Sequence, residues 1–253
     1  MRTGPVTDVF AQRATLARSV ALLREFRFEQ RDPARFYGAL AADTAAMLTD
    51  LWGARPAGTL LDVGGGPGYF ASAFTDAGWD YVGVEPDPAE MHAAGRVSGG
   101  EAGRFVRGSG LALPFADASV DVCLSSNVAE HVPSPWRLGE EMLRVTRPGG
   151  LAILSYTVWL GPFGGHETGP WHYLGGARAA ERYTRRHGHR PKNDYGSSLF
   201  AVSVADGLRW ARSTGMLVAA FPRYHPRWAW WLTSVPGVRE VAVSNLTLVL
   251  ARR

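Results

Sequence analysis

The segment LLDVGGGPGYF, residues 60–70, constrains the fold more than any other part of the chain. An apolar run ending at Asp62-Val63 predicts a buried strand, and glycines at 64, 66 and 68 predict a tight turn that opens onto a helix. Bare backbone amides in such a turn can hold a ligand at the amino end of the helix. Taken alone, the turn also fits a plain connection between a strand and a helix.

Segments typical of strands and helices alternate after this turn. The expected strands are residues 59–63, 80–84, 104–108, 120–126, 151–157, 216–221 and 245–251. The expected helices begin near Gly68, Asp87, Ser134 and Val204, and two more, from about Asp8 to Trp52, precede the turn and are separated at Asp32-Pro33. Alternation of this kind favours a parallel sheet with helices on both faces. We predict an α/β fold with a seven-stranded, mainly parallel sheet ending in an antiparallel strand.

The chain is expected to form one domain, residues 1–253, with four segments. N-terminal lid helices occupy residues 1–55, a core with the glycine turn 56–157, an insertion on the ligand side 158–202, and C-terminal strands with an aromatic insertion 203–253. In the helix after residue 134, Ser134 is expected to act as the cap, Pro135 suits the first turn, and Arg147 lies near the end.

Composition excludes several classes of protein. The chain lacks an apolar run of the roughly 18 residues that a membrane-spanning helix needs, and its first residues lack the apolar stretch of a secretory signal, so we expect a cytoplasmic protein. Cys123 is the only cysteine and is expected to be buried in a strand, which excludes an intramolecular disulfide and a cysteine metal cage. A net charge of +4 is small for a chain of 253 residues and argues against a nucleic-acid-binding surface.

An acidic residue follows the second expected strand at an informative distance. Glu85 lies nineteen positions after Gly66, where doubly wound sheets place an acid that binds the two hydroxyls of a ribose. Tyr69 stands where the dinucleotide-binding pattern G-x-G-x-x-G requires glycine. The spacing therefore indicates a nucleoside-containing ligand without the pyrophosphate fingerprint.

Four ordered motifs resemble the class I S-adenosylmethionine-dependent methyltransferases, and within them the type 11 group. They are LLDVGGGPGYF, VGVEPDP, LPFADASVDVCLSSNVAEHV and EMLRVTRPGGLAILSY, which span about Leu60 to Thr157. The whole chain also resembles uncharacterised actinobacterial members of the group. The resemblance implies a Rossmann-like fold, S-adenosyl-L-methionine as the cofactor, and donor contacts at Asp62, Gly64, Gly65, Gly66, Glu85, Ser109, Gly110, Leu111 and Asn127.

Methyl transfer from a sulfonium disperses positive charge, so positioning of the two reactants dominates catalysis. An oxygen or nitrogen acceptor also loses a proton, which calls for a base. The base candidates are His166, His131 and Glu167, with His166 preferred because it lies in the glycine-rich loop from Gly161 to Gly175 that follows the fifth strand. Each histidine also fits a purely structural role. We expect no metal site, because a histidine and a glutamate adjacent in sequence do not preform one.

The insertion supplies the expected acceptor contacts. His172, Tyr173 and Tyr195 offer ring surfaces, and Arg185 and Arg186 either bind an anionic acceptor group or form a solvated helix face. The segment with Trp228, Trp230 and Trp231 either covers the sheet edge, lines an apolar acceptor tail or contacts a membrane surface peripherally.

The sequence therefore predicts methylation of a small-molecule, lipid or glycan acceptor at oxygen. The fourth strand ends in SSNVAEH instead of an NPPY-type tetrad, which argues against methylation of the amino groups of DNA bases. The alternatives are an RNA methyltransferase, favoured by the basic run, and a catalytically silent donor-binding protein whose tryptophan-rich segment binds a partner. The sequence indicates neither the identity of the acceptor nor the oligomeric state.

Overall fold

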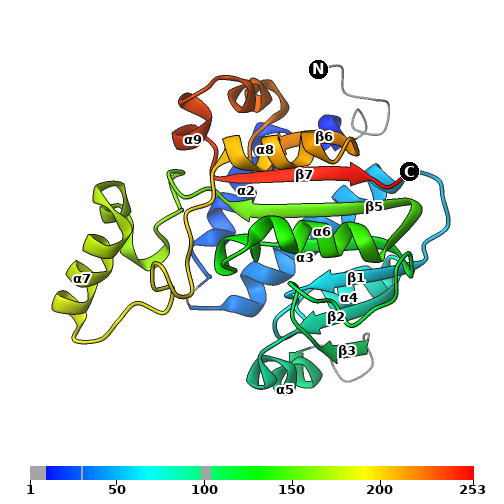
Figure 1. The fold of residues 1–253 in the computed structure, drawn as a ribbon, viewed down its shortest axis with the longest axis horizontal. Coiled ribbons are helices and arrows are strands. Elements are labelled where there is room, and N and C mark those ends of the chain that lie inside the picture. Colours follow the sequence, from blue (N-terminus) through cyan, green and yellow to red (C-terminus); the bar gives the residue numbers. More distant parts are fainter. Residues whose placement is uncertain (1–9, 30, 98–103) are drawn as a thin grey trace.

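The computed structural model describes residues 10–29, 31–97 and 104–253. One twisted sheet runs through the molecule with helices on both of its faces (Figure 1). Its strands, in the order β3-β2-β1-β4-β5-β7-β6, are β1 (Thr59–Val63), β2 (Asp80–Glu85), β3 (Arg104–Arg107), β4 (Val120–Ser126), β5 (Thr146–Thr157), β6 (Leu217–Pro222) and β7 (Asn245–Ala251).

The direction of the strands confirms the predicted topology. β7 pairs antiparallel with both β5 and β6, whereas the remaining pairs are parallel. The chain winds outward from β1 to β3 and then returns to β4 on the other side of β1. The carboxyl ends of β1 and β4 therefore flank the point where the strand order reverses, which is where open α/β sheets bind ligands.

Two layers of helices enclose the sheet because its central strands are apolar on both faces. Leu60 and Ile153 pack in one buried cluster with α3 (Pro33–Trp52) and α4 (Ala71–Asp76). Leu61 and Leu154 point the other way and pack with α6 (Pro135–Val145) and α8 (Val204–Ser213). Cys123 is fully buried in β4, as predicted.

The two N-terminal helices, α2 (Leu16–Phe26) and α3, are separated where the sequence predicted. The Asp32 side chain accepts a hydrogen bond from the Arg35 backbone N–H at 3.2 Å, and Pro33 occupies the first turn of α3. Asp43 of α3 forms ion pairs with Arg18 of α2 at 2.5 Å and with Arg223, after β6, at 2.6 Å. Both helices are therefore tied to the edge of the sheet. The predicted start near Asp8 lies outside the described residues.

Some boundaries differ from the prediction. α4 begins at Ala71 instead of Gly68, because Gly68 has a φ of +80°, outside the helical region. Ser134 stands at the cap of α6, but among the described residues its side chain accepts no hydrogen bond from that helix. α6 ends at Val145 and β5 begins at Thr146, so Arg147 belongs to a strand, where it pairs with Asp121. α5 spans Pro88–Val97 and follows β2.

The remaining segments surround the carboxyl edge of the sheet. The loop after β5 carries the short helices η2 (His166–Thr168) and η3 (Trp171–Leu174) and leads into α7 (Gly176–His187), which projects away from the sheet in Figure 1. The aromatic segment forms η4 (Arg227–Ser234) and α9 (Val238–Ala242). Within the described residues, none of the helices combines the length and apolar character needed to cross a membrane.

Candidate active site

The glycine turn after β1 is held in a conformation that favours glycine. Gly64 has a φ of +77° and Gly66 of +52°, and the Gly64 N–H donates to the carbonyl of Val84 at 2.7 Å. A Cβ atom on Gly64 would lie 2.5 Å from the side chain of Val128. The turn is thus pressed between the ends of β2 and β4, and a larger residue at Gly64 would separate these strands.

Glu85, the last residue of β2, reaches this turn. Its Oε2 accepts the N–H of Gly66 at 3.2 Å, and its Oε1 accepts the N–H of Asp87 at 3.0 Å. Burial raises the pKa of Glu85, while these two backbone bonds act in the opposite direction. The acid that the spacing singled out therefore lies against the glycine turn.

Asp62 lies beneath the same turn and is buried. Its Oδ2 accepts the hydroxyl of Tyr81 at 2.8 Å, and both atoms lie 3.0 Å from the position that a Cβ on Gly65 would occupy. Burial raises the pKa of Asp62 to about 6; the Tyr81 hydrogen bond lowers it, and nearby Glu85 raises it further. Asp62 therefore packs against the glycine turn at Gly65.

Ser109, Gly110 and Leu111, which are expected to contact the donor, follow β3. The N–H of Gly108 donates to the carbonyl of Glu85 at 3.2 Å, so this segment runs beside the glycine turn. The Ser109 hydroxyl accepts the N–H of Leu111 at 3.2 Å. Gly110 packs so closely on Val63 that a Cβ there would lie 2.9 Å from it. A tight backbone turn, rather than a carboxylate, therefore borders this end of the site.

Asn127 follows β4 with a left-handed φ of +57°. Its N–H donates to the carbonyl of Ser155 at 2.8 Å, and its Oδ1 accepts the side-chain amide of Asn245 at 2.7 Å. Asn245 also donates to the Thr157 hydroxyl at 3.2 Å, and Tyr224 shares a side-chain hydrogen bond with Asn127. The sequence analysis missed Asn245 and Tyr224, because no motif marks them and only the topology of the sheet brings them to Asn127.

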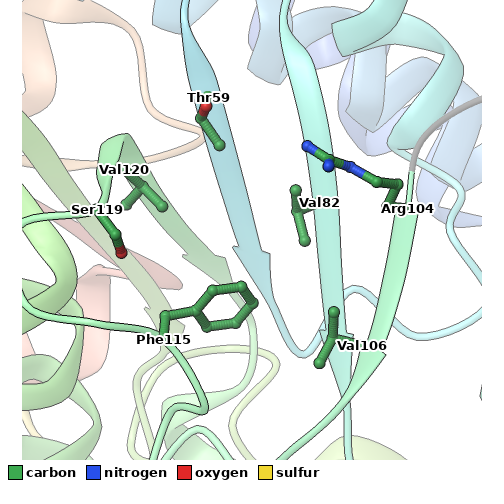
Figure 2. A pocket seen from close by; sticks show the side chains of 7 residues that line it. All are labelled: Thr59, Val82, Arg104, Val106, Phe115, Ser119 and Val120. Carbon is green, nitrogen blue, oxygen red and sulfur yellow. The ribbon is translucent and has the colours of Figure 1, made fainter.

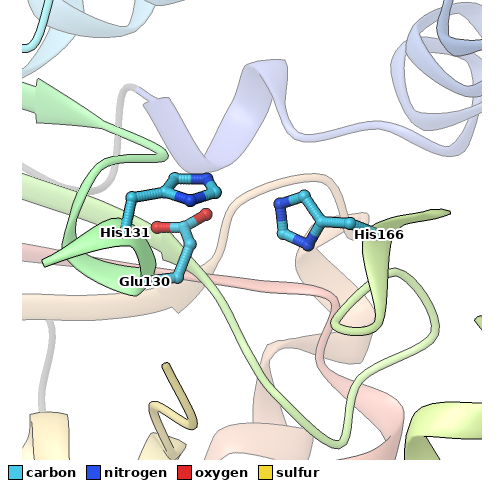
Figure 3. A group of neighbouring side chains, drawn as sticks. All are labelled: Glu130, His131 and His166. Carbon is cyan, nitrogen blue, oxygen red and sulfur yellow. The ribbon is translucent and has the colours of Figure 1, made fainter. Parts of the chain in front are cut away.

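Two of the base candidates meet in space. His131 closes η1 (Ala129–His131) after β4, and His166 begins η2 after β5; their ring centroids lie 5.1 Å apart. Glu130 is buried between the same elements, and its Oε1 accepts the N–H of Thr157 at 3.0 Å. Figure 3 shows the Glu130 carboxylate directed toward the two imidazoles.

His166 and the third base candidate, Glu167, have different environments. Burial lowers the pKa of His166, the nearby Glu130 carboxylate acts in the opposite direction, and the neighbouring His131 lowers it further. His166 also has a left-handed φ of +46°, which is uncommon outside glycine. Glu167, the third base candidate, points elsewhere: its Oε1 accepts the Asn193 side-chain amide at 3.0 Å.

The expected acceptor residues lie on the insertion. His172 is 1% exposed and packs between Trp159 and Tyr173, with ring centroids 5.4 and 4.1 Å away. Tyr173 and Tyr195 are 47% and 38% exposed. Their surfaces are therefore open to a ligand, whereas His172 lies underneath.

Two hollows lie away from the histidine cluster. One, of about 460 Å³, is lined on α7 by Arg182, Arg185 and Arg186. The other, of about 310 Å³, lies at the amino ends of β1, β3 and β4, remote from the glycine turn, and Phe115 points into it (Figure 2).

Five aromatic rings connect the two sides of the site through the N-terminal helices. Tyr69 of the glycine turn stacks on Tyr37 of α3 at 4.8 Å and 11°. The series continues from Tyr37 to Phe36 at 5.0 Å, from Phe36 to Phe26 at 5.6 Å, and from Phe26 to Phe163 at 4.7 Å. The helices α2 and α3 therefore contact both the glycine turn and the loop after β5.

Comparison with known proteins agrees with this geometry. The family described as "Methyltransferase domain" matches residues 61–154. An "Uncharacterized methyltransferase" of Mycolicibacterium gilvum is 78% identical over 96% of this chain and 98% of its own length, and one of Mycobacterium marinum is 75% identical over 98% and 99%.

Solved structures share the fold at low sequence identity. A geranyl diphosphate C-methyltransferase of Streptomyces coelicolor, 17% identical, aligns over 89% of this chain and 84% of its own with a TM-score of 0.58. A SAM-dependent methyltransferase of Thermotoga maritima, 16% identical, aligns over 93% and 97% with a TM-score of 0.54. The methyl donor is S-adenosylmethionine. The chain belongs to the class I S-adenosylmethionine-dependent methyltransferases, in a group with members in mycobacteria.

Proposed function

We propose that the protein transfers the methyl group of S-adenosylmethionine to an oxygen atom of a small-molecule, lipid or glycan acceptor. One observation carries the proposal: Glu130, His131 and His166 lie together at the carboxyl edge of the sheet. Glu130 and His131 follow Asn127 in the segment after β4. A hydroxyl must lose its proton as its oxygen gains the methyl group, and these side chains are the kinds that accept protons.

The donor is assigned to the glycine turn and the two segments beside it. Glu85 already binds the backbone of Gly66, so its carboxylate is within reach of a ribose lying on the turn. Asp62 packs against Gly65 of the turn and accepts a hydrogen bond from the Tyr81 hydroxyl. The full set of proposed donor contacts is Asp62, Gly64, Gly65, Gly66, Glu85, Ser109, Gly110, Leu111 and Asn127.

His166 is proposed to take the proton of the acceptor. The hydroxyl proton moves to the imidazole, the oxygen attacks the methyl carbon, and the carbon–sulfur bond breaks with its electron pair going to sulfur. The lowered pKa of His166 supports this role, because only the neutral ring can accept the proton. His131 in the same cluster and Glu167 on the same loop are the alternatives.

The side chains around the insertion support the proposed acceptor class. Exposed rings of Tyr173 and Tyr195 suit a sugar or an apolar ring, with His172 packed beneath Tyr173. Arg185 and Arg186 are proposed to bind an anionic group of the acceptor. Trp228 and Trp231, 69% and 57% exposed on η4, suit an apolar tail or a peripheral contact with a membrane surface.

Incubation with donor labelled in its methyl group tests the proposal. Lipid, glycan, small-molecule and RNA fractions of a mycobacterial extract would be offered separately, with Glu85→Ala as the matched control for donor-dependent labelling. The expected product carries the label on oxygen: a methyl ether that survives alkali, or a methyl ester that releases labelled methanol. Label on nitrogen, carbon or RNA would contradict the proposal. Intact donor binding without any labelled product would identify a silent donor-binding protein instead.

A further inference from the structure

The cluster at the ends of β4 and β5 has the composition of a metal site. Glu130, His131 and His166 each offer one ligand atom, and these three atoms all lie within 4.8 Å of one another. Figure 3 shows the three side chains converging from two separate segments, η1 and the loop after β5. Sequence adjacency alone did not predict this set, because its third member is 35 positions further along the chain.

Glu130 supplies an unsatisfied anionic oxygen. The residue is 1% exposed, and its Oε1 accepts the N–H of Thr157. Its Oε2 is buried and has no hydrogen-bond partner within the described part of the chain. A buried carboxylate oxygen left without a partner is costly, and a bound cation is one of the few groups that compensate it.

Both imidazoles are oriented as metal ligands commonly are. Nδ1 of His131 lies 2.7 Å from the carbonyl of Ser198, and Nδ1 of His166 lies 3.3 Å from the carbonyl of Gly164. A carbonyl can only accept, so in each ring Nδ1 donates the proton and Nε2 keeps its lone pair. Histidines that bind metals typically donate the other ring N–H to a carbonyl or carboxylate in this manner.

We propose that Glu130, His131 and His166 bind one divalent metal ion. Two imidazole nitrogens and one carboxylate oxygen favour a first-row transition ion such as Mn²⁺, Fe²⁺, Co²⁺ or Zn²⁺ over Mg²⁺ or Ca²⁺, which prefer all-oxygen sites. The three ligand atoms lie within 4.8 Å of one another, and an ion about 2.1 Å from each would hold neighbouring ligand atoms about 3.0–3.4 Å apart. Three protein ligands leave coordination positions open for a further oxygen.

The open position offers a second route to the proposed methylation at oxygen, in place of direct proton transfer to His166, and this part of the inference rests on the proposed function. The acceptor hydroxyl binds the ion, which lowers the pKa of that hydroxyl, and its proton passes to a water molecule. The oxygen then attacks the methyl carbon, and the electron pair of the carbon–sulfur bond remains on sulfur. An ion bound to Nε2 of His166 prevents that nitrogen from accepting the proton of the acceptor. Activation of the acceptor by the ion and direct proton transfer to His166 therefore cannot occur in the same molecule.

Titration of the full-length protein with Co²⁺ tests the site without measuring activity. The protein is prepared without a polyhistidine tag, freed of metal by a chelator, and followed by the visible absorption of Co²⁺, which reports nitrogen ligands. His131→Asn, His166→Asn and Glu130→Gln should each weaken binding by about tenfold or more, while His92→Asn, an exposed histidine on α5, leaves it unchanged. Melting temperature and donor affinity show whether each variant is folded.

The outcomes separate the metal site from the proposed function. Absence of a Co²⁺ spectrum for the wild-type protein up to millimolar Co²⁺, or equal binding by all three variants, overturns the metal site. Full methylation of an acceptor in excess chelator overturns the role of the ion and leaves direct proton transfer to His166. Metal binding that persists in a protein with no methylated product refutes the proposed function alone.

Discussion

Replacing Asp62 by asparagine should change how the stability of the protein depends on pH. Burial raises the pKa of Asp62 to about 6, against 3.8 for an unperturbed aspartate. The folded state binds a proton on Asp62 more tightly than the unfolded state does. The stabilisation of the folded state that results is fully present below about pH 4 and is lost as the pH rises through 6. The difference between the two pKa values corresponds to roughly 3 kcal/mol at neutral pH.

The asparagine side chain at position 62 is uncharged at every pH and can still accept a hydrogen bond from the Tyr81 hydroxyl. The variant should therefore not lose this stability as the pH rises. Urea unfolding without donor at intervals from pH 4 to 8 measures the effect as the difference between wild type and D62N. The two proteins should have similar stability near pH 4, and the variant should gain up to about 3 kcal/mol by pH 7.5. Asp76→Asn, an exposed site on α4, serves as the control. Parallel profiles for wild type and D62N would refute the reasoning.

Three further predictions concern the site. Glu85→Ala should cost about 1.5–3 kcal/mol of donor affinity, a rise in Kd of about 10- to 150-fold by calorimetry, because a charge-assisted contact is lost; unchanged affinity removes Glu85 from the site. Arg185→Gln with Arg186→Gln should raise the KM of an anionic acceptor at constant donor affinity, and equal KM values would make these arginines a solvated face. His166→Ala should lower turnover by about two to four orders of magnitude with donor binding intact, His131→Ala being compared alongside; wild-type turnover from pH 6 to 9 would contradict it.

The sequence predicted most of the fold because its local signals agree with its topology. Apolar runs of five to seven residues bounded by glycine, proline or charged residues marked the strands, and the winding of the parallel sheet follows from their alternation with helices. The errors lie at boundaries. The start of α4 was misplaced because Gly68 serves the turn in a left-handed conformation, and the end of α6 because β5 extends back to Thr146.

The arrangement of the glycine turn and Glu85 was more predictable than that of the residues at the ends of β4, β5 and β7, for a physical reason. Gly64, Gly66 and Glu85 lie on one strand–turn unit and its neighbour, so their spacing along the chain reflects their spacing in space. The edge formed by the ends of β4, β5 and β7 joins residues that are distant in sequence. His131 and His166 meet because β4 and β5 are parallel neighbours, and Asn245 reaches Asn127 because β7 returns antiparallel beside β5. Such contacts depend on the register between neighbouring strands, which the pattern of residues along the chain does not determine.

If the donor lies against Tyr69 and the acceptor against the loop of Phe163, as proposed, the series of rings between them makes the binding of the two ligands thermodynamically dependent on each other. Each ring contact contributes about 0.5–1.5 kcal/mol, and the rings lie on four separate segments, so a displacement of Tyr69 changes the position in which Phe163 and its loop are most stable. A donor that favours the stacked arrangement therefore strengthens acceptor binding. By linkage, the acceptor would then strengthen donor binding by the same factor, although the two proposed sites lie at different ends of the series.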